Sequence, residues 1–135
     1  MILRPKELKF KKTRKRRPNV KLEFKNNKLV FGSIGLKSLV NGVITSRQIE
    51  AARQTITRKI KRKGKVWIRI FPHIPVTAKP LESRMGKGKG SVSHWCAFVN
   101  VGTTLFEICG VPKHIAIGAL KSGSNKLPLK TRIFD

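Results

Sequence analysis

A short segment of alternating glycine and lysine is the strongest sign of binding chemistry in this sequence. Residues 84–90 read Arg-Met-Gly-Lys-Gly-Lys-Gly. Glycine lets the backbone come close to a ligand and turn its amides toward it, while each cation attracts negative charge. The segment therefore predicts an anion-binding loop. The cations of this loop and the glycines expected to allow close backbone approach are Arg84, Lys87, Lys89, Gly86, Gly88 and Gly90.

Two common phosphate-binding motifs fit this segment poorly. A Walker A loop needs a glycine five residues ahead of Gly-Lys-Ser/Thr, and the dinucleotide fingerprint needs a different glycine spacing. A flexible turn would account for the glycines but not for the cations placed between them.

Residues for catalysis or metal binding are scarce. The six acids are scattered, and no two have a spacing that implies a shared site, so metal-assisted nuclease chemistry is not expected. His94, Cys96, Cys109 and His114 have a spacing that fits no familiar metal site. We expect no catalytic residue, no bound metal and no cofactor.

The charge of the chain points to a polyanionic partner. Among 135 residues, 31 Lys and Arg stand against six Asp and Glu, a formal charge of +25. Nucleic acid is the first candidate and an anionic membrane surface the second. No apolar run is long enough to cross a bilayer. The sequence lacks helix-turn-helix, RRM and C2H2 patterns and aromatics suited to base stacking, so we expect shape and phosphate recognition of folded RNA.

The N-terminal residues form a basic segment that cannot pack on itself without a counter-charge. A solvated tail is the alternative, but the charge of the whole chain favours an arm that orders along phosphates. We expect an arm over residues 1–19 and a single domain over residues 20–135. The cations assigned to RNA in the arm are Lys9, Lys11, Lys12, Arg14, Lys15, Arg16 and Arg17.

A helix is predicted from Thr45 to a stop at Gly64. Thr45 and Gln48 have the spacing of a capping box. One stripe of the helix is apolar and should face the core, formed by Ile49, Ala52, Ile56 and Ile60. The opposite side is basic and either solvated or bound to phosphate, with Arg47, Arg58, Lys61 and Arg62 as its cations.

The remaining patterns predict an α+β fold, a mostly antiparallel sheet with two helices packed on it. We expect a hairpin over 20–31 turning at Asn26-Asn27, a loop over 32–42, a strand over 66–71 and a long connection over 72–90. Strands over 94–101 and 104–109 should form a tight hairpin at Gly102. A short helix with Pro112 in its first turn and a strand over 127–134 should complete the fold.

At several places the residues are also similar to a known family. The matching segments are 49–53, 64–72, 75–77, 79–80, 84–90, 105–107, 110–112 and 126–131. They resemble, in order over nearly the whole chain, the L-sixteen family of large-subunit ribosomal proteins of bacteria and organelles. Three positions depart from the family pattern: Arg-rich residues 13–17 replace a His-Arg-Gly-Arg-like segment, Cys109 replaces an acid, and Gln54 replaces an arginine.

The resemblance implies an α+β protein with defined partners. These are large-subunit ribosomal RNA, tRNA in the region of the aminoacyl site, and neighbouring ribosomal proteins, without a membrane. It also implies late incorporation during subunit assembly. Among the cations, it assigns Arg84, Lys87 and Lys89 to the RNA-facing loop and aligns Lys9, Lys11 and Lys12 with the family's basic N-terminal stretch.

The sequence also suggests a cellular compartment and a second candidate function. The match begins close to Met1, which leaves no room for a transit peptide, and richness in Lys, Ile, Asn and Phe suggests an AT-rich gene. We expect an organelle-encoded protein of the mitochondrial ribosome, with a plastid ribosome or a bacterial cytoplasm as alternatives. The alternative function is a free RNA chaperone or a nucleic-acid condensing protein.

The two cysteines are expected to be free, packed thiols that lie next to each other. A two-residue turn at Gly102-Thr103 places Cys96 opposite Cys109, with Cβ atoms about 4.5 to 5.5 Å apart, wider than a disulfide requires. A turn centred on Val101-Gly102 would instead place Cys96 opposite Glu107.

Overall fold

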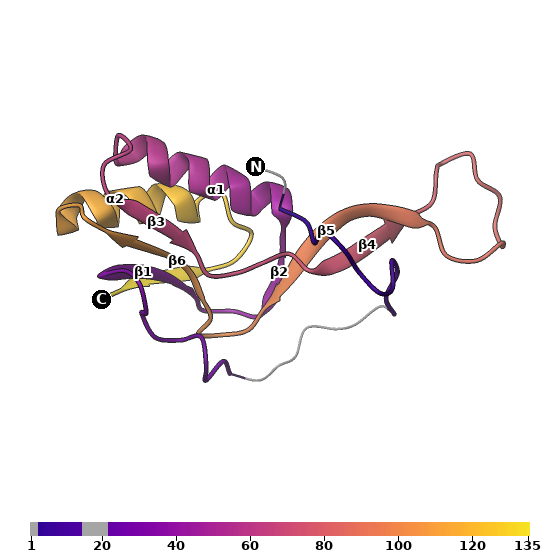
Figure 1. Ribbon diagram of the computed structural model, residues 1–135, viewed down its shortest axis with the longest axis horizontal. Coiled ribbons are helices and arrows are strands. Elements are labelled where there is room, and N and C mark those ends of the chain that lie inside the picture. Colours follow the sequence, from indigo (N-terminus) through magenta and orange to yellow (C-terminus); the bar gives the residue numbers. More distant parts are fainter. Residues whose placement is uncertain (1–2, 15–21) are drawn as a thin grey trace.

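A computed structural model describes residues 3–14 and 22–135. This part of the chain forms an α+β fold of two helices and seven strands in antiparallel sheets, which confirms the predicted fold class (Figure 1). In chain order the elements are β1 (Ile34–Ser38), β2 (Gly42–Thr45), α1 (Ser46–Lys59), β3 (Lys65–Ile68), β4 (Ile74–Ala78), β5 (Ser91–Val99), β6 (Thr104–Cys109), α2 (Lys113–Ser124) and β7 (Thr131–Phe134).

The strands form two separate sheets. One has the order β3-β6-β1-β7 and the other the order β2-β5-β4. Helices α1 and α2 pack against each other on the same side of the four-stranded sheet, whereas β4 and β5 extend away from it as a two-stranded ribbon (Figure 1). The ribbon ends in the connection of residues 79–90. None of the helices in the described part of the chain is long and apolar enough to cross a bilayer.

Helix α1 begins as its pattern predicts, but it ends at Lys59 with Ile60 as its C-cap, before the predicted stop at Gly64. The Thr45 hydroxyl accepts a hydrogen bond from the Gln48 backbone N–H, and the Gln48 side chain accepts one from the Thr45 N–H, a complete capping box. The apolar stripe is buried, with Ile49, Ala52 and Ile56 at 0% exposure. Gly123 of α2 permits the close contact between the helices, because a Cβ there would lie 2.6 Å from the Ile56 Cγ1.

A buried carboxylate joins the segment before β1 to the four-stranded sheet. Glu107 of β6 has 0% exposure, and its Oε2 accepts hydrogen bonds from the backbone N–H groups of Val30 (3.3 Å), Phe31 (2.7 Å) and Gly32 (2.8 Å). Its Oε1 accepts one from Arg69 and forms an ion pair with it. Burial alone would raise the pKa of Glu107, but these donors outweigh burial and lower it, so the carboxylate stays charged.

The same contacts organise an aromatic stack beside β3. Phe31 stacks on Trp67 with ring centroids 6.1 Å apart, and the Arg69 guanidinium lies 5.3 Å from the Phe31 ring centroid. Glu107 therefore orients both the backbone that carries Phe31 and the cation that covers its ring. Nothing in the spacing of the acids along the sequence predicts this role.

The predicted hairpin over residues 20–31 is wrong in its described part. Residues 22–31 form bends without a strand. The alternation of Leu22 and Phe24 with charged residues suggested a half-buried strand, yet their side chains are 60% and 80% exposed. The backbone N–H groups of residues 30–32 donate to the Glu107 side chain rather than to the carbonyl oxygens of a neighbouring strand. Residues 20 and 21 lie outside the described residues.

The predicted loop over residues 32–42 is also wrong, because it contains β1 and the start of β2. Gly35 and Gly42 lie in these strands, where the absence of a side chain allows close packing. A Cβ at Gly35 would lie 2.6 Å from Leu29 Cδ2, and one at Gly42 would lie 2.3 Å from Leu129 Cδ2. Glycine in a strand often marks such a close approach.

The long connection predicted over 72–90 is interrupted by β4, which includes Pro75. Strand β4 pairs only with β5 and forms an edge of its sheet, where a residue without an N–H is tolerated. The other elements differ from the predicted ones mainly in where they begin or end. Strand β3 stops at Ile68, β7 begins at Thr131, and Pro112 is the N-cap of α2 rather than part of its first turn.

The tight hairpin predicted between residues 94–101 and 104–109 is wrong. Strands β5 and β6 belong to different sheets, and the chain crosses between them at Gly102, whose N–H donates to the Ser38 carbonyl oxygen (2.8 Å). Cys96 therefore faces Thr45 and Ile74, and Cys109 faces Lys65. Both predicted registers for Cys96 fail. The two thiols are free as predicted, but only Cys96 is packed, because Cys109 is exposed.

The predicted division into an arm and a domain stays a prediction, since its boundary at residues 19 and 20 lies outside the described residues. Leu3, within the expected arm, is 8% exposed and belongs to the core.

Replacing Glu107 by glutamine should destabilise the fold by about 3 kcal/mol or more. One carboxylate oxygen accepts hydrogen bonds from the backbone N–H groups of residues 30–32, and the other accepts one from Arg69. A glutamine amide has only one oxygen, so its NH₂ group would face one of these sets of donors and leave it without an acceptor. Urea unfolding measures the change. The matched control is Glu82→Gln, an exposed acid in residues 79–90 whose replacement should change stability by less than about 0.5 kcal/mol. Equal stabilities of the two variants would contradict the role assigned to Glu107.

Candidate nucleic-acid interface

The structure brings part of the basic arm to the glycine-lysine loop. The Lys12 ammonium donates a hydrogen bond to the Lys89 carbonyl oxygen (2.8 Å), and the Lys89 ammonium donates one to the Thr13 carbonyl oxygen. Figure 1 shows the N-terminal segment crossing the β4–β5 ribbon. Lys9, Lys11, Lys12 and Arg14 are all exposed on this segment. The predicted RNA-binding residues Lys15, Arg16 and Arg17 lie outside the described residues.

The loop itself has an open, left-handed backbone. Gly86, Lys87 and Gly88 have φ values of 97°, 51° and 78°. In residues 3–14 and 22–135, no atom beyond the adjacent residues lies within 4 Å of a Cβ built on Gly86 or Gly88, so these glycines supply backbone freedom on a face that a ligand can approach. The Lys79 ammonium donates to the Gly86 carbonyl oxygen (2.5 Å) and ties the loop to the end of β4.

Gly90 has a different environment from the other two glycines of the loop. A Cβ there would lie 2.3 Å from the Ala78 carbonyl oxygen, so its close backbone neighbour in this structure is β4. Arg84 is exposed with Lys87 and Lys89, and Met85 beside it is 98% exposed.

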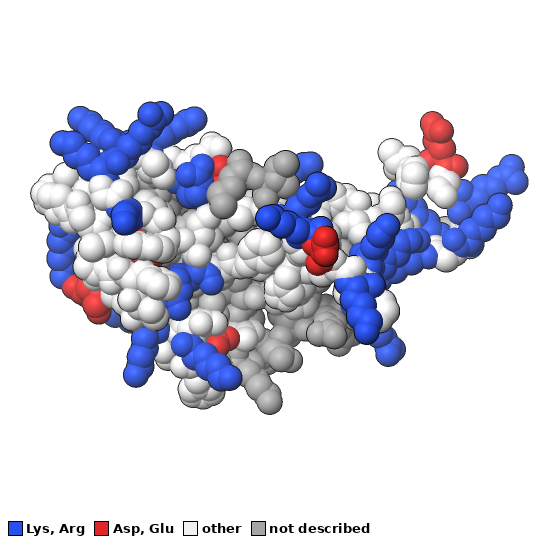
Figure 2. Space-filling model, viewed as in Figure 1, with Lys and Arg blue, Asp and Glu red and all other residues white. Residues whose placement is uncertain are grey.

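The cations predicted on the basic side of α1 lie at its two opposite ends. Arg47 lies in the first turn, whereas Arg58 lies 11 residues later, roughly 16 Å along the axis. Lys61 and Arg62 follow the helix end in left-handed conformations, with φ values of 52° and 61°. Further exposed cations at this end are Lys59, Lys63 and Lys65. Figure 2 shows Lys and Arg gathered at the end of α1 and, on the other side of the molecule, around the ribbon tip.

Several acids are already neutralised within the chain. Glu50 pairs with Arg53 (2.7 Å), Glu107 with Arg69 and Asp135 with Lys113. Hydrogen bonding from Arg53, opposed by burial and aided by Gln54, lowers the pKa of Glu50 to about 2. None of the predicted RNA-binding cations in the described part of the chain takes part in these three pairs.

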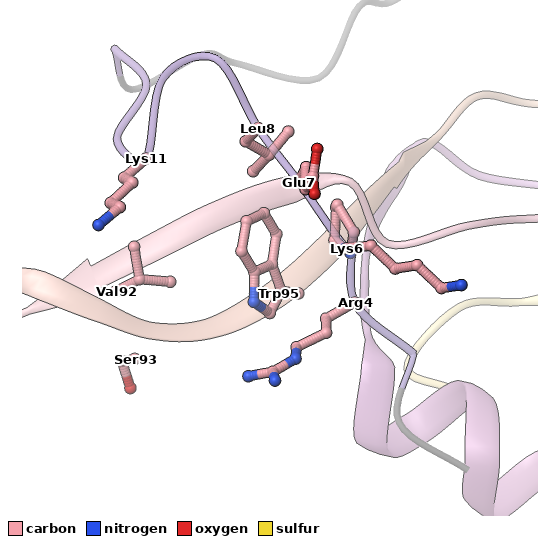
Figure 3. A pocket seen from close by; sticks show the side chains of 9 residues that line it. Arg4, Lys6, Glu7, Leu8, Lys11, Val92, Ser93 and Trp95 are labelled. Carbon is pink, nitrogen blue, oxygen red and sulfur yellow. The ribbon is translucent and has the colours of Figure 1, made fainter.

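A groove that the sequence did not predict lies beside the arm. Its two larger cavities measure about 800 and 540 Å³, and Arg4, Ser93 and Trp95 line both. Figure 3 shows the Arg4 side chain extending toward the Trp95 indole, while Lys6 points away. Arg47 lines the second cavity and joins it to a smaller one. Arg4 belongs to the basic run read in the sequence, but no local signal places Trp95 near it.

The residues considered for a metal site are distributed over the fold. Cys96 is buried in β5 of one sheet, and Cys109 is exposed at the end of β6 in the other. In residues 3–14 and 22–135, no three His, Cys, Asp or Glu side chains are grouped so that they could hold a metal ion.

Comparison with known proteins identifies the family. The family described as Ribosomal protein L16p/L10e matches residues 5–134. The chain belongs to this ribosomal protein family. The large ribosomal subunit protein uL16 of Borrelia recurrentis (strain A1) is 54% identical over 130 residues, covering 96% of this chain and 94% of the relative. The uL16 of Psychrobacter arcticus is 53% identical over 132 residues, covering 98% and 96%.

Membership of the L16p/L10e family confirms the resemblance read from the motifs, and the similarity is to the bacterial type. The family match includes the described arm residues from 5 onward, all of α1 and the glycine-lysine loop.

The two faces of α1 should respond differently to substitution. Ile56→Asp should unfold or strongly destabilise the protein, because it buries a carboxylate without a partner between α1 and α2. Arg58→Ala removes an exposed cation, so it should leave the melting temperature nearly unchanged and weaken RNA binding. Thermal unfolding and filter binding measure the two effects. A larger loss of stability for Arg58→Ala than for Ile56→Asp would show that the faces are inverted.

Proposed function

We propose that this chain is a structural constituent of the large ribosomal subunit that binds ribosomal RNA through phosphate and shape contacts. The observation that carries the proposal is the family match over residues 5–134, at more than half identity to proteins named for the large subunit. The exposed cations of the described arm residues, the loop and the end of α1 provide the contacts that RNA binding requires. In this role the protein needs no catalytic group of its own.

The position of the β4–β5 ribbon supports this proposal. It extends the exposed loop cations away from the packed body, and the arm meets the loop at its base. We place the body and the end of α1 on ribosomal RNA, beside neighbouring ribosomal proteins. The loop then reaches toward tRNA in the region of the aminoacyl site, and incorporation occurs late in subunit assembly.

The compartment stays a prediction. The uL16 relatives from Borrelia and Psychrobacter are bacterial, which is compatible with a ribosome in a bacterial cytoplasm and gives no support to the mitochondrial ribosome first expected.

Sedimentation distinguishes the proposed role from a free RNA chaperone. In extracts of the source cells, a ribosomal protein should migrate with the large subunit at close to one copy per particle. Quantitative immunoblotting across a sucrose gradient, with a known large-subunit protein as the internal standard, measures the ratio. Recovery mainly in the light fractions would favour the chaperone and overturn the proposal.

Salt should weaken binding of the purified protein to large-subunit RNA steeply. If about six to ten phosphates are engaged, released counterions should lower the affinity by about 10³ to 10⁵ between roughly 50 and 200 mM salt. Filter binding over this range measures the slope. Lys87→Gln and Lys89→Gln together should reduce the slope by about two, one for each lost phosphate contact. A flat response to salt would exclude phosphate contacts as the main source of affinity.

A further inference from the structure

The groove beside the arm has the composition of a site for one unstacked nucleotide. Trp95 is half-buried in β5, and its ring lines both of the larger cavities. Each cavity falls within the size range of ordinary ligand pockets, about 300 to 1,000 Å³. An aromatic ring in an open cationic groove is the usual platform on which proteins stack an unpaired base.

A bulge in β5 explains how the strand turns several side chains toward this groove. The pairing with β4 runs Val76 to His94 and then Thr77 to Val92, which leaves Ser93 as an extra residue. A bulge interrupts strict alternation and re-aims neighbouring side chains. Val92, Ser93 and Trp95 consequently all line the larger cavity, although a regular strand would direct Val92 to the opposite face.

The charges around the groove suit the phosphate of the same nucleotide. Arg4 and Lys11 line the larger cavity with a single acid, Glu7, whereas Lys6 lines it with its ammonium turned away from Trp95 (Figure 3). Arg4 and Arg47 line the second cavity with Glu50, whose charge Arg53 neutralises at 2.7 Å. Arg4 lines both cavities beside Trp95 (Figure 3). The groove therefore offers a cation, Arg4, on the same lining as the Trp95 ring.

We propose that this groove binds one unpaired nucleotide of the RNA, with its base stacked on Trp95 and its phosphate held by Arg4 and Arg47. The proposal rests on the RNA-binding function proposed above and adds base stacking to phosphate contacts. It departs from the expectation that the chain lacks aromatics suited to stacking, and the experiment below decides between the two. A paired base cannot use the site, because its faces are covered by its neighbours in the helix.

Tryptophan fluorescence tests this site in the full-length protein. The chain has two tryptophans, so Trp67→Phe leaves Trp95 as the only indole and keeps a ring against Phe31. The probes are a short single-stranded RNA of mixed sequence, an RNA duplex of equal length, and inorganic polyphosphate. We expect the single strand to quench Trp95 emission, and the duplex and polyphosphate to bind without quenching it.

Affinity of the same probes provides a second readout. Trp95→Leu should weaken binding of the single strand by roughly fivefold or more, while duplex binding stays within about twofold. Trp95→Phe, which keeps a stacking ring, should restore most of the affinity. Circular dichroism and thermal unfolding establish that each variant is folded.

The results separate the failure of this site from the failure of the proposed function. If the RNA binds with the expected salt dependence but Trp95 emission does not change, the nucleotide site is wrong and the phosphate contacts stand. Equal quenching by polyphosphate would likewise exclude stacking. If none of the RNAs binds even at low salt, the proposed function fails together with the site.

Discussion

The buried Glu107 carboxylate is the interaction on which the arrangement of the four-stranded sheet depends. A charge without exposure is costly unless it is paired and hydrogen-bonded, and here three backbone N–H groups and Arg69 meet that need. The same contacts join β6 to residues 30–32 before β1 and to Arg69 after β3. Since Phe31 then stacks on Trp67, one carboxylate determines how an otherwise irregular segment covers the edge of the sheet.

The large positive charge constrains where the cations can lie. At physiological salt the Debye length is about 8 Å, and α1 alone, with 14 residues, spans roughly 21 Å. Cations at the end of α1 therefore repel those near the arm and loop only weakly, and most of the repulsion arises within each group. Of the six acids, Glu50, Glu107 and Asp135 form ion pairs within the chain, and the arm and the loop segment contain only one acid each, Glu7 and Glu82. Each group thus needs its own external counter-charge, which favours a polyanion that covers several surfaces.

Local signals predicted the elements that local interactions determine. The cap at Thr45, the buried stripe of α1 and the glycine-lysine sequence of residues 84–90 could all be read from neighbouring residues. The errors arose where distant contacts decide the structure. Gly35 and Gly42 resembled chain breakers but allow close packing, and Gly102 resembled a hairpin turn but carries the chain from one sheet to the other. The Trp95 groove was missed for the same reason, since the arm and β5 are far apart in sequence.

The β4–β5 ribbon relates the proposed nucleotide site to the loop. Trp95 and Ser91, where the loop ends, belong to one strand and pair with Pro75 and Ala78 of β4, so they lie three ladder steps apart, roughly 10 Å at the usual rise of a strand. Lys12 and Lys89 also tie the arm, which forms one wall of the groove, to the base of the loop. In the proposed complex, the ribbon and these two hydrogen bonds therefore limit the separation between a stacked base and the phosphates at the base of the loop. Such spacing lets the protein select an RNA by the distance between an unpaired nucleotide and its neighbouring backbone, without hydrogen bonds that read the identity of the base.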